Sequence, residues 1–175
     1  RGGRGGAEFE FDERRHDKGE KTVLGVKIPA GGGKSDGDRV LEIVLKHSST
    51  AKFVSRKLAQ KFVADEPPAS LVAKMAETFT KSDGDIKAVM RVMILSPEFS
   101  SAGAYRAKVK TPLEMVASAA RALDANVESA ALLARQLNEL GQPLYRKVEP
   151  TGYPSANNEW VNSSALVGRM NFALS

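Results

Sequence analysis

The chain has 175 residues, of which 42% are apolar and 27% are charged, with a formal net charge of +5 and no cysteine. This length and composition fit one globular domain that can bury a core, and they argue against general disorder. No apolar run approaches the roughly 18 residues that a membrane-spanning helix needs. Without cysteine, the chain has no disulfide, no thiolate metal site and no cysteine nucleophile.

The excess positive charge lies in the first third of the chain. Residues 1–64 carry 14 Lys and Arg against 9 Asp and Glu, and residues 65–175 carry 12 against 12. An excess of this size is compatible with an anionic partner, but most basic proteins bind none. The opening RGGRGG matches RNA-binding Arg–Gly repeats only weakly, because it has two copies and no aromatic residue between them. We interpret it as a tail.

Two segments with alternating apolar residues predict a small β-hairpin near the N-terminus. EFEFD (8–12) and TVLGVKI (22–28) both alternate, and the second would place Leu24, Val26 and Ile28 on one face. The connection between them, about residues 12–21, contains the polar run RRHDKGEK. A glycine-rich break follows at 29–38.

The rest of the chain has helical periodicity. Apolar residues at helical spacing, with Ser, Asp and Thr caps and with Pro112 at a helix start, predict helices that turn apolar stripes toward one core. In the first helix the inward residues would be Val40, Leu41, Val44 and Leu45. The expected helices are 35–46, 48–62, 65–79, 82–95, one from 111, 126–141 and one from 163. We therefore predict a mainly α protein: a bundle of about six to eight helices at 35–175, with a tail, hairpin and linker at 1–34.

The order of the motifs resembles the bacterial family called domain of unknown function 1800. The resemblance runs from about Phe9 to the end of the chain. It implies a helical domain from the C-terminal portion of a longer protein, since family members are longer, and many of them look exported. The family has no established reaction, so the resemblance implies no catalytic residue. The segments that carry it are FDERRHDKGEKTVLG, GDRVLEIVLKHSSTAKFVSRKLAQKFVADEPP, DGDIKAVMRVMILSPEF, YRAKVKTPLEMVASAARAL and LGQPLYRKVEPTGYPSANNEWVNSSALVGRMNFAL.

The polar loop before the hairpin is the first candidate site, with His16, Asp17, Glu20 and Lys21 around Gly19. A histidine beside an aspartate is compatible with general-base chemistry or metal binding. A metal site usually needs three or more ligands, however, and the second histidine is far away in the sequence. We favour a structural role, in which Asp17 caps the turn, Gly19 has a positive φ, and His16 and Lys21 pair with carboxylates or helix ends as the loop docks.

A basic helix face and an aromatic loop are the other two candidates. No acid lies between Ile43 and Ala64, and the basic residues of the second helix surround an aromatic side chain: Lys52, Phe53, Arg56, Lys57 and Lys61. We interpret this face as solvated, although a partner could cover Phe53. The loop 142–160 contains Tyr145, Tyr153 and Trp160, which could line a carbohydrate or peptide groove or could anchor the loop.

We expect an interaction or structural module of an exported bacterial protein, in the periplasm or outside the cell. Its partner would be another protein or the N-terminal part of a longer form of its own chain. The alternative is a hydrolase of envelope or polysaccharide material with the His16 and Asp17 loop at its site, and a weaker alternative is nucleic-acid binding through the basic third. We expect no cofactor and no metal, and whether the chain is an enzyme stays open.

Overall fold

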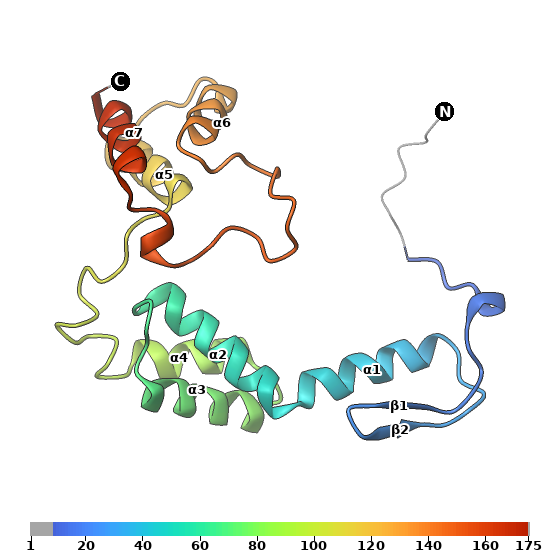
Figure 1. The fold of residues 1–175 in the computed structure, drawn as a ribbon. Helices are drawn as coiled ribbons and strands as arrows, with labels where there is room; N and C mark the ends of the chain where they lie inside the picture. The colour runs from blue at the N-terminus through green and yellow to red at the C-terminus, as the bar shows by residue number, and fades with distance from the viewer. Residues whose placement is uncertain (1–8, 175) are drawn as a thin grey trace, which may run out of the picture.

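The computed structural model describes residues 9–174, so the RGGRGG segment lies outside the described part (Figure 1). The mainly α fold with a small hairpin near the N-terminus is confirmed. In chain order the elements are a 3-10 turn (Glu13–Arg15), β1 (Lys21–Val23), β2 (Val26–Ile28), α1 (Lys34–Lys46), α2 (Ser48–Phe62), α3 (Ala69–Lys81), α4 (Ile86–Ile94), α5 (Pro112–Ala122), α6 (Ala130–Glu139), a second 3-10 turn (Asn157–Glu159) and α7 (Ser163–Leu174).

The hairpin is smaller than predicted and uses different residues. β1 and β2 pair antiparallel, with Val23 opposite Val26, and the turn between them consists of Leu24 and Gly25 with φ values of 49° and 80°. Two positive φ values are the pattern of a tight type I′ hairpin turn. The prediction that residues 8–12 pair with 22–28 is wrong, because residues 9–12 form no strand. The turn lies inside the alternating run, and leucine is an unusual residue at a positive φ, so the run looked like one strand.

The best-packed core lies among α2, α3 and α4. Each of these helices contributes a stripe of small or medium apolar side chains, and Leu71, Met75, Val89 and Met93 are fully buried there. α4 begins at its cap, Asp85, whose carboxylate accepts hydrogen bonds from the first backbone amides of the helix. The small residues on α2 allow α3 to pack closely against it.

The α5–α7 region has its own smaller set of buried residues. α5 begins with a capping box in which Thr111 and Glu114 satisfy each other's backbone amides, and Pro112 occupies the first turn as predicted. α6 ends at Glu139 with Leu140 as its C-cap, and Gly141 follows with a φ of 85°, as expected for a C′ residue. The side-chain carbonyl of Gln142 accepts a hydrogen bond from the Leu113 amide at 2.8 Å, which ties the end of α6 to the start of α5.

A polar clasp joins the C-terminal loop to the α2–α4 bundle. Asp65, between α2 and α3, pairs with Lys108 and accepts a hydrogen bond from the Asn157 amide at 2.7 Å. The Asn157 side chain in turn bonds the backbone of Ala107 and Val109. Figure 1 shows the resulting shape of the molecule, which is an open curve. The hairpin and α1 lie at one end, the α2–α4 bundle lies in the middle, and α5–α7 lie at the other end.

Candidate interaction surface

The polar loop docks on the first turn of α1 through Asp36. His16 Nε2 and Lys21 Nζ each lie 2.9 Å from the same carboxylate oxygen, Oδ2 of Asp36, and only 9% of the Asp36 side chain is exposed. The Phe11 ring packs against the His16 imidazole in an edge arrangement, with ring centroids 5.4 Å apart. Two residues of the predicted loop are thus brought together with a carboxylate fifteen to twenty positions further along the chain.

Electrostatics favour the ionised form of Asp36. The hydrogen bond from Lys21, and after it the one from His16, holds the pKa of this carboxyl below its ordinary value of 3.8. The backbone of Gly32 passes so close to Asp36 that a Cβ there would lie 1.9 Å from Oδ1. Any larger residue at position 32 would displace the Asp36 carboxylate from this position, so the linker also contributes to the dock.

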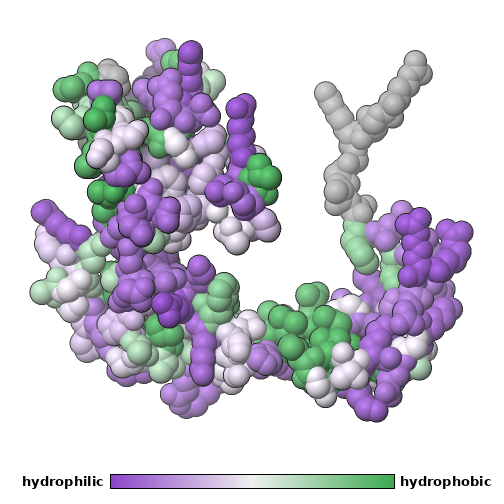
Figure 2. All heavy atoms as spheres, in the orientation of Figure 1, coloured by the Kyte–Doolittle hydropathy of each residue, from purple (hydrophilic) through white to green (hydrophobic). Residues whose placement is uncertain are grey.

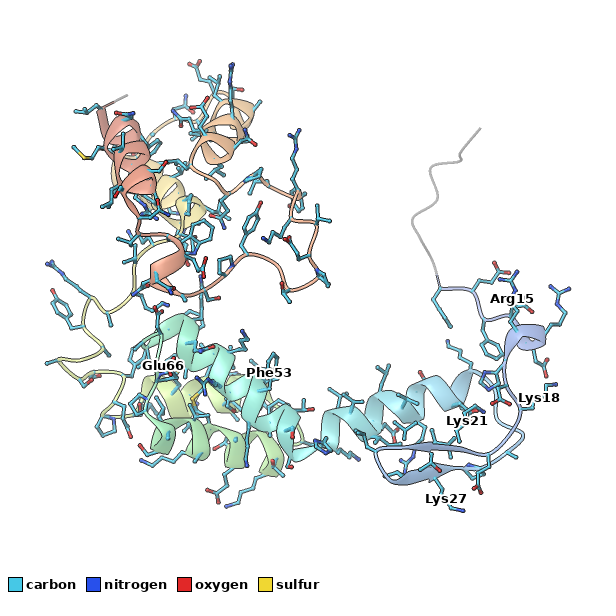
Figure 3. The ribbon with its side chains drawn as sticks, viewed as in Figure 1. Arg15, Lys18, Lys21, Lys27, Phe53 and Glu66 are labelled. Atoms are coloured by element: carbon cyan, nitrogen blue, oxygen red, sulfur yellow. The ribbon has the colours of Figure 1, made fainter. Side chains whose placement is uncertain are left out.

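The other loop residues serve the turn and do not reach Asp36. Asp17 Oδ1 accepts a hydrogen bond from the Gly19 amide at 2.8 Å, which is the capping of the turn that we expected. Glu20 pairs with Lys27 across the hairpin at 3.0 Å. The expected positive φ at Gly19 is wrong; in this region Gly25 and Gly31 have that conformation. Figure 3 places Lys21 and Lys27 at this hairpin end of the molecule.

The aromatic residues of the C-terminal loop do not form one groove. Trp160 is 7% exposed, and its Nε1 donates to the Pro154 carbonyl at 2.9 Å. Tyr153 lies beside it, with ring centroids 6.1 Å apart, and its hydroxyl donates to the Pro143 carbonyl at 2.7 Å. Tyr145 is fully exposed, at 103%, with a φ of 58°. Two of the three aromatic residues therefore act as anchors, as a long ordered loop requires.

The basic face of α2 is partly neutralised. Arg56 pairs with Glu66 at 3.2 Å, and Lys61 pairs with Glu114 of α5. Lys52 is exposed, and Lys57 lies over the Phe53 ring, with its Nζ 5.6 Å from the centroid. Phe53 is 62% exposed on the outer side of α2 (Figure 3).

An exposed apolar face on α1 is the feature that sequence reasoning missed. The prediction that Leu41, Val44 and Leu45 point into the core is wrong: they are 61%, 43% and 59% exposed. α1 has its main helix and strand contacts with β2 and α2, because it projects from the bundle, and a continuous apolar area covers it in Figure 2. We call Leu41, Val44 and Leu45 the α1 face. Helical periodicity shows that a helix is amphipathic, but it does not show what covers the apolar side.

Two grooves flank α1. The first, of about 770 Å³, lies between the end of α1, the start of α2 and the turn before α4, and its apolar lining includes Leu45, Val54 and Ile86. The second, of about 290 Å³, lies between α1 and the hairpin tip, where Leu24 and Val26 are exposed. Glu42, Lys46 and His47 line both grooves. A helix flanked by two apolar grooves is a suitable surface for a second helix.

No helix within residues 9–174 is long and apolar enough to cross a membrane. In the same range, no group of three or more His, Asp or Glu side chains is placed to hold a metal ion.

Comparison with known proteins gives a family but no activity. No curated protein and no solved structure matches the chain. One family model, described as "Protein of unknown function (DUF1800)", matches residues 2–175, which is nearly the whole chain. The chain therefore belongs to this family of uncharacterised proteins, as the order of its motifs indicated.

Proposed function

We propose that the chain is a helical interaction module that binds an amphipathic helix of a protein through the α1 face. The observation that carries the proposal is the exposure of three large aliphatic side chains on one helix between two grooves. Burying one such side chain is worth about 1.5–3 kcal/mol. Contiguous apolar patches on a soluble protein commonly mark interaction sites, and this one has the shape of a site for a helix.

The polar loop supports this function by positioning the hairpin. Asp36 lies in the first turn of α1, and its bonds to His16 and Lys21 fix the loop that leads into β1. The hairpin tip is thereby held beside α1, where Leu24 and Val26 form one wall of the smaller groove. The role that we propose for His16 is therefore structural.

The two alternatives find less support. A hydrolase using His16 would need substrate to reach its imidazole, whereas this side chain is 17% exposed, packs against Phe11 and lines neither groove. Nucleic-acid binding would need a dense cluster of unpaired cations, whereas two of the four cations on the α2 face, Arg56 and Lys61, are in ion pairs.

The proposal is tested with a defined helical probe. The probe is a fluorescent 18-residue peptide of Leu, Ala, Glu and Lys with one leucine stripe, and its scrambled form is the control. We expect fluorescence anisotropy to show binding of the striped peptide and a loss of at least tenfold in affinity for the double variant Leu41→Ser, Leu45→Ser. The matched variant Leu123→Ser, Leu132→Ser, which changes leucines exposed by 79% and 65% on the far end of the molecule, should bind normally. Equal binding by the two double variants would contradict the proposal.

The resemblance to exported family members supports a location in the periplasm or outside the cell, and we propose this location for the protein in a bacterial host. Fractionation of cells that make the native, tagged protein tests it. Recovery in the periplasmic or secreted fraction is the expected result, and recovery in the cytoplasmic fraction alone would contradict it.

A further inference from the structure

We propose that the helix bound by the α1 face is α1 of a second copy of this chain, packed antiparallel about a two-fold axis. This inference rests on the proposed function and names the partner. It is carried by the pattern of charges beside the α1 face, which is complementary to itself.

The charges lie on one flank of α1. Glu42 and Lys46 are four residues apart, so they lie on the same side of the helix, next to Leu41 and Leu45, which are also four residues apart. Glu42 Oε2 accepts a hydrogen bond from Arg39 Nη1 at 2.7 Å, and both side chains are about half exposed. Lys46 has no ion-pair partner among residues 9–174 and lines both grooves. The flank therefore presents an acid and an unpaired base at a fixed spacing.

A two-fold axis near Ile43 brings these groups together. In an antiparallel pair of helices, residues at equal distances on either side of the axis lie opposite each other. With the axis between Ile43 and Val44, Leu41 of one copy lies within one residue position, about 1.5 Å along the helix, of the point opposite Leu45 of the other copy. Glu42 lies equally close to the point opposite Lys46 of the second copy, within reach of these long side chains. The two-fold axis repeats each contact, so the pair of α1 helices has two leucine contacts and two ion pairs.

The neighbouring elements enlarge the contact. A stable interface buries about 800 Å² on each partner, which is more than one helix face alone provides. Leu24 at the hairpin tip and Ile86 at the start of α4 are 62% and 45% exposed beside the two grooves. Packing of the ridge of each α1 into a groove of the other copy would cover these residues as well.

Charge complementarity selects a second copy over an unrelated helix. A complementary partner offers an acid opposite Lys46 and a base that can share Glu42 with Arg39, with two aliphatic side chains beside them four residues apart. α1 itself meets all of these conditions. An isologous contact also needs a single surface on a single chain, and the structure provides one.

The test is a charge exchange followed by sedimentation velocity over a range of concentrations. We expect the wild type to form a dimer as its concentration rises, and we expect Glu42→Lys and Lys46→Glu each to raise the dimer dissociation constant by about tenfold or more. The double variant Glu42→Lys, Lys46→Glu restores opposite charges across the axis and should dimerise like the wild type. Glu139→Lys, which reverses an exposed acid paired with Arg135 on α6, is the matched control and should have no effect.

The outcomes separate this inference from the proposed function. A wild type that is monomeric at every concentration, or a double variant that remains as weak as the single ones, would overturn the two-fold pairing. If that monomer still binds the striped peptide through Leu41 and Leu45, the interaction module stands and its partner is a different helix. If it binds neither a second copy nor the peptide, both proposals fail.

Discussion

Truncation of a core leucine and of an α1-face leucine should have very different effects on the free energy of unfolding. Leu71 is 0% exposed within the α2–α4 core, and replacing such a residue by Ala costs about 2–5 kcal/mol. Leu45 is 59% exposed, so only about two-fifths of its surface contributes to stability, a value under about 1 kcal/mol. The higher helix propensity of alanine offsets part of that loss.

Urea unfolding, followed by circular dichroism at concentrations where the chain is monomeric, measures this difference. We expect Leu45→Ala to lose under about 1 kcal/mol and Leu71→Ala to lose at least about 2 kcal/mol. Leu41→Ala serves as a second test of the same face, because its side chain is 61% exposed. A loss of about 2 kcal/mol or more for Leu45→Ala in the monomer would mean that the α1 face is buried within one chain, and it would refute the reasoning.

Two further predictions concern the dock and the aromatic loop. Lys21 and then His16 lower the pKa of Asp36 in the folded chain, so the contribution of the dock is present well above the ordinary value of 3.8 and is lost as the pH falls through the lower folded pKa. NMR signals of the hairpin measure whether the loop is docked on Asp36. We expect the loop of the wild type to undock in acid, and that of Asp36→Asn to be undocked already at neutral pH. An Asp36→Asn variant whose loop is docked at pH 7 would contradict this. Trp160→Ala should cost about 3–5 kcal/mol and Tyr145→Ala under about 0.5 kcal/mol in thermal unfolding, because the first side chain is buried and the second is fully exposed. Equal losses of stability in the two variants would contradict the assignment of Trp160 as an anchor of the loop and of Tyr145 as an exposed residue without that role.

Local sequence signals predicted most of the helices and several of their ends. Thr111 and Pro112 begin α5 as their residue types indicate, and Gly141 follows α6 with the positive φ that a C′ glycine adopts. These features depend on interactions within one turn of backbone, which a short window of sequence contains. α4 was predicted about one turn too long at its start, since the helix begins at Ile86 after its cap, Asp85.

Features that depend on distant residues could not be predicted in the same way. The sequence indicated that His16 and Lys21 would pair with carboxylates or helix ends, but it did not indicate Asp36 as the partner of both. Its proximity to both depends on the path of the linker through Gly31 and Gly32. The burial of a face is set by tertiary packing, and no local pattern distinguishes an amphipathic helix in a core from one that projects from it.

The hairpin illustrates a third limit. The alternation at Leu24, Val26 and Ile28 was interpreted as one strand, whereas the chain reverses at Leu24 and Gly25. A glycine in the middle of a short alternating run is compatible with either arrangement. The choice depends on which partner strand is available, and here it is the other half of the same run.

Methyl NMR of the chain with labelled Leu and Val side chains tests the central claim most directly, because it observes the α1 face itself. During titration with the striped peptide at concentrations where the chain is monomeric, the methyl signals of Leu41, Val44 and Leu45 should shift together and saturate. Those of Leu166, which is 47% exposed on α7, should not move. If the α1-face methyls stay unchanged, or if they shift no more than Leu166, the interaction surface is not where this account places it.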